Sequence, residues 1–295
     1  MTKNDKRVLS TQTISDWKNQ FNRQSLDHLE PEVKTLEGSK PLINVIGSPL
    51  TALPFAAQIE LMLEWASSRA SKIVCVANVH MLMEAYWHPE FSSVLKSADL
   101  VTPDGMPLVW MMRLMGAPEQ NRVAGMEILM SLCQLAPQRN ISIFFLGSEA
   151  TVLERIRRKL EQEFPNLQIA GMEPLPFRSL TPAENDVIIQ KIHESKAGLV
   201  LVALGCPKQE NWMHQNKGKI QAVMIGLGGV FPIIAGIYKR APLWMQNLGL
   251  EWFYRLSQDP HRLVGRYLKT NPPFILLALW QLLTQYLRIN RSITM

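Results

Sequence analysis

The stretch Leu199–Trp212 reads LVLVALGCPKQENW, and it decides the expected fold. Its first six residues are all apolar, which indicates a strand with both faces buried. Gly205 then ends the strand, and Pro207 is suited to the first turn of a helix. A buried strand, a glycine turn and a helix in immediate succession are typical of a parallel sheet covered by helices.

The same alternation runs along most of the chain. Apolar runs that read as strands lie at 72–76, 99–102, 141–146, 167–170, 199–204 and 222–227. Segments with helical periodicity lie at 55–70, 106–115, 127–136, 151–164, 183–195 and 209–216. We therefore predict an α/β fold: a doubly wound, mainly parallel, Rossmann-like sheet with helices on both faces and a helical C-terminal appendage.

Length and composition exclude several classes of protein. With 295 residues, 47% of them hydrophobic and 19% charged, the chain is neither disordered nor collagen-like. Its three cysteines include no CxxC pair, so neither a disulfide framework nor a zinc ribbon is expected. The six histidines form no HxxxH or HExxH motif, and there is no DxD pair. We therefore expect neither a metal ion nor a cofactor.

Charge and polarity divide the chain into three parts. Residues 1–40 are a polar N-terminal extension without the apolar core of a secretory signal, so we expect no export by that route. Residues 41–238 are the α/β body. Residues 239–295, the C-terminal appendage, carry eight Lys or Arg against two Asp or Glu and account for the whole net charge of +6. Such an appendage suits an anionic partner, whether phosphate, lipid headgroups or nucleic acid.

The most apolar run of the appendage, residues 274–287, reads FILLALWQLLTQYL. It is shorter than the ~20 residues that span a bilayer. Basic residues flank it and Trp280 and Tyr286 lie within it, as in helices that lie in the plane of the headgroups. A core-packing or oligomer-forming helix fits the same pattern, so both alternatives stay open.

Ligands of parallel α/β sheets bind beyond the carboxyl ends of the strands, so residues that follow strands are candidate site residues. Asp104 lies in the turn Thr102–Gly105, TPDG, where a carboxylate can accept a proton from an attacking hydroxyl. The same turn is also an ordinary β-turn. Gly147 and Ser148 can direct backbone N–H groups toward a diphosphate, or form only a turn in which the serine caps the next helix.

The segment after the fifth strand carries several functional groups on one helical turn. Lys208 can neutralise phosphate, and the Gln209 amide can both donate to and accept from sugar hydroxyls. We expect Cys206 to be a small buried thiol rather than a nucleophile, because no histidine is close in sequence. Arg122 suits phosphate recognition, with a surface ion pair as the ordinary alternative. The residues expected to bind substrate along these loops are Gly147, Ser148, Gly205, Pro207, Lys208, Gln209, Glu210, Gly228 and Gly229.

These motifs resemble those of the WecG/TagA/CpsF family of bacterial glycosyltransferases (glycosyltransferase family 26). The matching stretches are VANVHMLMEA (76–85), ADLVTPDGMPLVW (98–110), NRVAGMEIL (121–129), FFLGS (144–148), GCPKQENWM (205–213), IGLGGVFPIIAG (225–236) and KRAPLWMQNLGLEWFYRLSQDPHRLVGRYL (239–268). The resemblance covers nearly two-thirds of the chain.

The resemblance implies an inverting, metal-independent glycosyltransferase. It would move an N-acetylmannosamine-type or related hexose from a UDP-sugar to a polyprenyl-diphosphate-linked saccharide in bacterial surface polysaccharide synthesis. By position in the motifs, Asp104 resembles the family's catalytic base, and Asn78, Arg122 and Gln209 resemble its polar active-site residues. The appendage is similar to the family's membrane-targeting segment, which also supplies arginines to the diphosphate. The candidates for that role are Arg240, Arg255, Arg262 and Arg266.

The resemblance also implies partners and a location. The expected partners are the UDP-sugar, the lipid-linked acceptor and an anionic membrane surface; a homo-oligomer is left open and no nucleic acid is expected. The expected location is the cytoplasm, in peripheral association with the inner face of the cell membrane.

Two positions depart from the family pattern. Val76 stands where many members carry Thr, and Pro232 follows Phe231 where Asp is common. A non-catalytic, membrane-associated sugar-nucleotide binder is therefore an open alternative. A nicotinamide- or flavin-binding oxidoreductase is another, although only the doubly wound pattern supports it.

Overall fold

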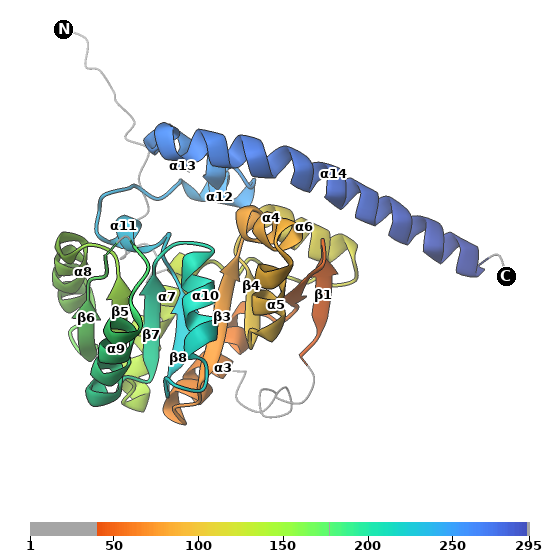
Figure 1. Cartoon of the computed structure of the whole chain (residues 1–295). Coiled ribbons are helices and arrows are strands. Elements are labelled where there is room, and N and C mark those ends of the chain that lie inside the picture. Colours follow the sequence, from red (N-terminus) through yellow and green to blue (C-terminus); the bar gives the residue numbers. More distant parts are fainter. Residues whose placement is uncertain (1–39, 177, 294–295) are drawn as a thin grey trace, which may run out of the picture.

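The computed structural model describes residues 40–176 and 178–293, and its centre is a parallel sheet of six strands (Figure 1). The strands lie in the order β4-β3-β8-β7-β5-β6, and every neighbouring pair is parallel. Their bounds are β3 Lys72–Ala77, β4 Leu100–Pro103, β5 Ile143–Gly147, β6 Ile169–Glu173, β7 Leu199–Ala203 and β8 Val223–Gly226. Because all six strands point the same way, the residues that follow them lie along one edge of the sheet.

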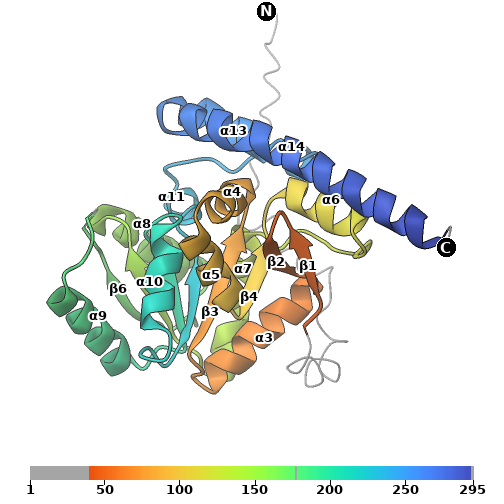
Figure 2. The same ribbon diagram turned by 45° about the vertical axis from the view of Figure 1, so that its right-hand side comes forward.

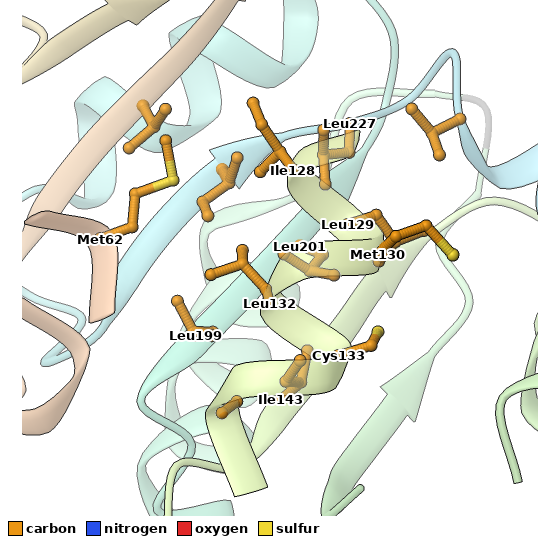
Figure 3. Close-up of a cluster of buried hydrophobic side chains, with 14 of the residues drawn as sticks. Met62, Ile128, Leu129, Met130, Leu132, Cys133, Ile143, Leu199, Leu201 and Leu227 are labelled. Carbon is orange, nitrogen blue, oxygen red and sulfur yellow. The ribbon is translucent and has the colours of Figure 1, made fainter. Parts of the chain in front are cut away.

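Alternate residues of the strands enter two separate hydrophobic clusters, one on each face. In β3, Val74 and Val76 belong to the first cluster, whereas Ile73 and Cys75 belong to the second. Figure 3 shows the first cluster, with Leu132 of α7 beside Leu199 and Leu201 of the sheet. The first face is covered by α3 Phe55–Ser67, α7 Gly125–Leu135 with the 3-10 helix η2 Ala136–Arg139, and α8 Ala150–Glu163. The second is covered by α4 Val79–Trp87, α5 Pro89–Ser97, α6 Met106–Leu114, α9 Pro182–Ser195 and α10 Lys208–Asn216.

This arrangement confirms the predicted doubly wound α/β fold, and all six predicted strands are present. The structure adds an antiparallel hairpin of β1 Leu42–Val45 and β2 Ser48–Thr51 that the sequence pattern did not predict. Its strands are too short for a clear alternation of apolar residues. Its turn is formed by Ile46 and Gly47, whose φ angles are 48° and 79°.

The chain after β8 folds back over the sheet. It forms α11 Phe231–Ile234, α12 Leu243–Asn247, α13 Glu251–Gln258 and α14 Pro260–Ile293. Helices α13 and α14 lie across the edge that holds the carboxyl ends of the strands (Figures 1 and 2). Gln281 of α14 donates to the Asn44 carbonyl at 2.7 Å, and its Oε1 accepts from the Ile46 N–H at 2.9 Å. The predicted helical appendage is therefore docked on both α4 and the hairpin.

The apolar run 274–287 lies within α14 and has two different faces. Phe274 and Ala278 are 4% and 7% exposed and belong to the second cluster. The opposite side is uncovered, with more than half of each side chain exposed, and consists of Ile275, Leu276, Leu279, Trp280, Leu283, Tyr286 and Leu287. The run thus joins features of both open alternatives. Among the described residues, no helix has the length and apolarity that crossing a membrane requires.

We expect Gly147→Ala to destabilise the fold strongly. Gly147 has a φ of 95°, and an added Cβ would lie 2.5 Å from the carbonyl oxygen of Ala203 in the neighbouring strand. Strained φ and backbone clash together should lower the free energy of unfolding by roughly 3 kcal/mol or more. Gly218→Ala is the matched control, because Gly218 has a φ of 84° but open space around it. It should lose only about 1 kcal/mol. Urea unfolding measures both, and equal losses would contradict the clash.

Candidate active site

The ends of β3 and β4 bring two predicted site residues together. The N–H of Asp104 donates to the carbonyl of Ala77 at 2.9 Å, which fixes the turn after β4 to the end of β3. A Cβ on Gly105 would lie 3.8 Å from the Cα of Asn78, so the turn also approaches the start of α4 closely. Asp104 and Asn78 therefore share one corner of the sheet edge.

Asn78 is the N-cap of α4. Its Oδ1 accepts a hydrogen bond from the Met81 N–H at 3.1 Å, which satisfies one of the free N–H groups of the first helical turn. Asn78 is also exposed. Its capping role is therefore compatible with contact to a ligand beside Asp104.

Arg122 connects the body to the appendage. The N–H of its neighbour Val123 donates to the Pro103 carbonyl at 2.9 Å, which holds this loop against the end of β4. The guanidinium donates from Nη1 to Glu251 Oε2 at 2.8 Å and from Nη2 to Gln246 Oε1 at 2.9 Å. Arg122 thus reaches both α12 and α13 from the turn that precedes α7.

Two further arginines complete an arginine cluster, defined here as Arg122, Arg240 and Arg255. Arg240 donates to Glu127 and, at 3.0 Å, to Gln246 Oε1. Arg255 Nε donates to Glu251 Oε1 at 2.9 Å. The cluster is therefore interleaved with two glutamates, and each arginine is held by at least one of them.

Asp104 is partly buried, and two arginines of this cluster, Arg122 and Arg255, are close enough for their charges to act on its carboxyl. Burial raises the pKa of its carboxyl, and this effect outweighs the opposing charges of Arg122 and Arg255, so that the pKa is about 6. Glu251 and Glu127 raise the pKa further. At neutral pH the carboxyl is mainly ionised and is a better proton acceptor than an ordinary aspartate, as general base catalysis requires.

Glu251 has the opposite balance. Burial disfavours its ionised form, but Arg255, Arg122 and Arg240 together outweigh burial and lower its pKa to about 2. Glu251 therefore stays charged near neutral pH and serves as the fixed counter-ion of the cluster.

Gln209, at the start of α10, is buried and joins two loops. Its Oε1 accepts from the Gly205 N–H at 3.2 Å and from the Gly228 N–H at 3.3 Å, while Nε2 donates to Glu210 at 2.7 Å. These bonds occupy the oxygen and one amide hydrogen inside the protein. The expected contact of this amide with sugar hydroxyls stays a prediction.

The loop after β8 lies between Gln209 and the arginine cluster. A Cβ on Gly228 would lie 2.7 Å from Gln209 Oε1, so only glycine fits there. A Cβ on Gly229 would lie 3.4 Å from Arg255 Nη1. Gly228 thus brings this loop against Gln209, and Gly229 brings it against the guanidinium of Arg255.

The other predicted loop residues lie along the same edge of the sheet. Lys208 and Gly205 are exposed, and Pro207 precedes α10 as its N-cap. Ser148 has a φ of 68°, and Glu149 rather than Ser148 is the N-cap of α8, so the alternative that the serine caps this helix is wrong. Strands β8 and β7 lie between β3 and β5, so the Gly147–Ser148 turn lies on a different part of the sheet edge from Asp104.

Arg262 and Arg266 lie outside the arginine cluster. Arg262 Nε donates to Asp259 Oδ2 at 2.6 Å on the exposed side of α14. Arg266 is close to His80 of α4, where burial first and this arginine second lower the pKa of the imidazole. The expectation that these two arginines bind diphosphate stays a prediction, with less geometric support than for Arg240 and Arg255.

Three residues of the site were not predicted: Glu127, Gln246 and Glu251. All three lie within the sequence stretches that carry the family resemblance, but nothing in the pattern pairs them with arginines. Glu251 is one of only two acidic residues in the C-terminal appendage, which is the signal that could have pointed to it.

Cys206 was expected to be a buried thiol, and the structure places it in a half-buried position. Burial is the first cause that raises the pKa of the Cys206 thiol well above its usual range, as expected for an unreactive thiol. The Cγ1 of the buried Val76 would lie 3.7 Å from a Cβ on Gly125, in an apolar environment, and Pro232 lies in the first turn of α11.

In the described part of the chain, no three His, Cys, Asp or Glu side chains converge as metal ligands would.

Comparisons with known proteins agree with the resemblance of the motifs. The glycosyl transferase WecG/TagA/CpsF family matches residues 43–288. An N-acetylglucosaminyldiphosphoundecaprenol N-acetyl-beta-D-mannosaminyltransferase of Bacillus spizizenii is 33% identical over 227 residues, 76% of this chain and 85% of the relative. A protein with the same name from Bacillus subtilis is 33% identical over 199 residues, 67% of this chain and 76% of the relative.

We expect the titration of Asp104 to move in opposite directions when its neighbours are neutralised. Arg122→Gln removes a positive charge that lowers the Asp104 pKa, so the midpoint should rise above about 6. Glu251→Gln removes a negative charge that raises it, so the midpoint should fall. Carboxyl chemical shifts from carbon-13 NMR measure both. A shift of the midpoint in the same direction in both variants would contradict the assigned effects of these two charges on the Asp104 pKa.

Proposed function

The chain belongs to the WecG/TagA/CpsF family of glycosyltransferases, and we propose that it transfers a hexose from a UDP-sugar, with inversion and without a divalent metal, to a polyprenyl-diphosphate-linked saccharide. The observation that carries this proposal is the Asp104 carboxyl, with its raised pKa, close to Arg122 and Arg255 at one corner of the sheet edge.

The choice of acceptor rests on the two Bacillus relatives. Their name describes transfer of N-acetylmannosamine to a saccharide on undecaprenyl diphosphate. At 33% identity, an N-acetylmannosamine-type or related hexose is the natural proposal for the donor of this chain as well. The product would be a lipid-linked intermediate of bacterial surface polysaccharide.

In the proposed reaction, Asp104 accepts the proton of the acceptor hydroxyl. The hydroxyl oxygen then forms a bond to the anomeric carbon while the bond from that carbon to the UDP oxygen breaks. The electron pair of the broken bond leaves with UDP. A single displacement of this kind inverts the anomeric configuration, and it requires stabilisation of the charge that develops on the diphosphate.

The arginine cluster is suited to stabilise that charge. Arg255 is the most accessible of the three, with 36% of its side chain exposed, against 14% for Arg122 and 9% for Arg240. We assign Arg255 to direct contact with the diphosphate and the other two to the surrounding positive potential. Glu251 and Glu127 hold the guanidinium groups before substrate arrives, which limits the reorganisation that the reaction needs.

The uncovered apolar side of α14 is proposed to lie on the inner face of the cell membrane. Its exposed leucines, Trp280 and Tyr286 have the composition of an interfacial helix, and the appendage carries the net positive charge that attracts anionic lipids. This helix begins two residues after α13, which bears Arg255. Docking would therefore bring the arginine cluster toward a lipid-linked acceptor.

One alternative keeps a specific observation in its favour. Position 76 is a valine, so it lacks the hydroxyl that many family members carry here. Its side chain is buried among apolar groups. A sugar-nucleotide binder without transferase activity would fit that loss. The match to a glycosyltransferase family does not favour the oxidoreductase alternative.

We expect Asp104→Asn to lower the rate of transfer by roughly 10²- to 10⁴-fold, because general base catalysis typically contributes that factor. The amide keeps the shape of the carboxyl but cannot accept the proton. Purified protein, a panel of UDP-sugars and a lipid-diphosphate acceptor, with product mass spectrometry, provide the assay. In the wild type, kcat/KM should fall as pH drops through about 6, where Asp104 becomes protonated.

Controls separate the alternatives. Calorimetric UDP binding should be retained by Asp104→Asn, since the substitution leaves the arginine cluster intact. Wild-type turnover should persist in excess EDTA, and loss of turnover restored by a divalent ion would refute metal independence. UDP-sugar binding without transfer to any acceptor by the wild type would favour the non-catalytic binder.

We expect binding to anionic vesicles to depend on the uncovered side of α14. Deletion after Tyr267, or Leu279→Glu within the full chain, should weaken co-sedimentation with phosphatidylglycerol vesicles, and added salt should weaken it for the wild type. Val187→Glu is the matched control, because Val187 is an exposed apolar residue of α9 on the body. Undiminished binding by the truncated protein would locate the membrane contact elsewhere.

A further inference from the structure

A carboxyl group that the proposed reaction does not use is completely buried beside the site. Glu210, in the first turn of α10, is 0% exposed. Its Oε1 accepts from Gln209 Nε2 at 2.7 Å, and Oε2 has no hydrogen-bond partner among the described residues. Because buried glutamates are rare and costly, the retained carboxyl calls for a role.

The carboxylate determines which way the Gln209 amide faces. An ionised carboxylate only accepts hydrogen bonds, so the NH₂ side of the amide must face Glu210. The amide oxygen then faces the N–H groups of Gly205 and Gly228, which both donate to it. The reversed amide would set NH₂ against these two donors and lose all three bonds.

The hydrogen bonds of Gln209 connect α10 to the arginine cluster through the loop after β8. A Cβ on Gly226 would lie 2.7 Å from Gln209 Nε2, so the amide is closely packed against the end of β8. Gly229 follows directly on the loop that Gln209 holds, and a Cβ there would lie 3.4 Å from Arg255 Nη1. Arg255 in turn is bonded to Glu251, the counter-ion of Arg122.

We propose that Glu210 is a positioning residue of the transferase: its carboxylate orients the Gln209 amide, and the amide holds the Gly205 and Gly228 loops in the arrangement that seats Arg255. This inference rests on the proposed function, in which Arg255 contacts the diphosphate.

The proposal predicts a second pH-dependent step. Burial raises the pKa of Glu210 to about 7, against the lowering effect of the Gln209 bond. The facing titratable groups are the thiols of Cys75 on β3 and Cys206 on the preceding loop, both with raised pKa values; His80 and Glu84 of α4 lie beyond Cys206. As pH falls through about 7, Glu210 gains a proton and orients the amide less strictly.

Hydrogen exchange tests the orientation without any need for activity. In Glu210→Gln, the new amide can present NH₂ or oxygen to Gln209, so exchange should speed up by about tenfold or more in peptides covering residues 204–210 and 226–230. Glu154→Gln on α8 makes the same chemical change at an exposed glutamate and should leave these peptides unchanged. Unchanged exchange in Glu210→Gln would overturn the proposal.

A swapped pair tests whether the hydrogen-bond pattern, rather than the fold alone, is responsible. In the double variant Gln209→Glu, Glu210→Gln, the carboxylate at position 209 accepts from both glycines and from the amide at position 210. Slow exchange should therefore return, even if the single variant Glu210→Gln does not fold. Exchange as fast as in the single variant, or failure of the double variant to fold, would overturn the proposal.

Kinetics supply the link to catalysis. Glu210→Gln should lower kcat/KM by roughly ten- to a hundredfold, as expected for misplacement of a group that acts on the diphosphate. Its pH profile should keep the step near 6 from Asp104 and lose the step near 7 that we expect for the wild type. A profile that is only scaled down would indicate a purely structural role and overturn the proposal. Absence of transfer by the wild type would refute the proposed function, while the exchange measurements still decide the role of Glu210.

Discussion

The ion pair between Arg122 and Glu251 is the interaction on which the site depends. It joins residues 129 positions apart, at an Nη1–Oε2 distance of 2.8 Å, with 14% and 18% of the two side chains exposed. Breaking such a pair by removing one partner leaves a poorly solvated charge and typically costs about 3–5 kcal/mol. The ion pair therefore stabilises the docking of the appendage on the body. Both of its charges also act on the Asp104 carboxyl.

Because of this arrangement, the docking of α13 also changes the pKa of Asp104. Glu251 and Arg255 both come from α13, and they act on the Asp104 pKa in opposite directions. Without α13 the carboxyl would lie at an open strand end, where the desolvation that raises its pKa would be smaller. The raised pKa of Asp104 therefore depends on the docking of α13 on the body.

The sequence predicted the sheet and the edge at which the candidate residues lie, for physical reasons that also explain what it missed. Buried parallel strands are continuous apolar runs, and the edge that binds ligands follows from their direction, so both Asp104 and Asn78 could be placed at that edge. The partners Glu127, Gln246 and Glu251 depend on how the appendage docks, which no local pattern encodes. Arg262 and Arg266 illustrate the same limit: their charge was evident, but the side of α14 that each occupies depends on the docked helix.

Gln281, a polar residue within the apolar run 274–287, has a structural role that the sequence does not indicate. In the sequence it is one of the polar residues inside the run FILLALWQLLTQYL. In the structure its amide bonds the turn of the β1–β2 hairpin through both its oxygen and its nitrogen, on the same side of α14 as Phe274 and Ala278. Phe274, Ala278 and Gln281 are spaced by four and three residues, so they form one stripe of the helix. Leu277 also packs against the second cluster, whereas Leu276 and Leu279 are exposed on the other side. The two hydrogen bonds of Gln281 and the packing of Phe274 and Ala278 therefore act on the same side of α14, and the other side is left uncovered.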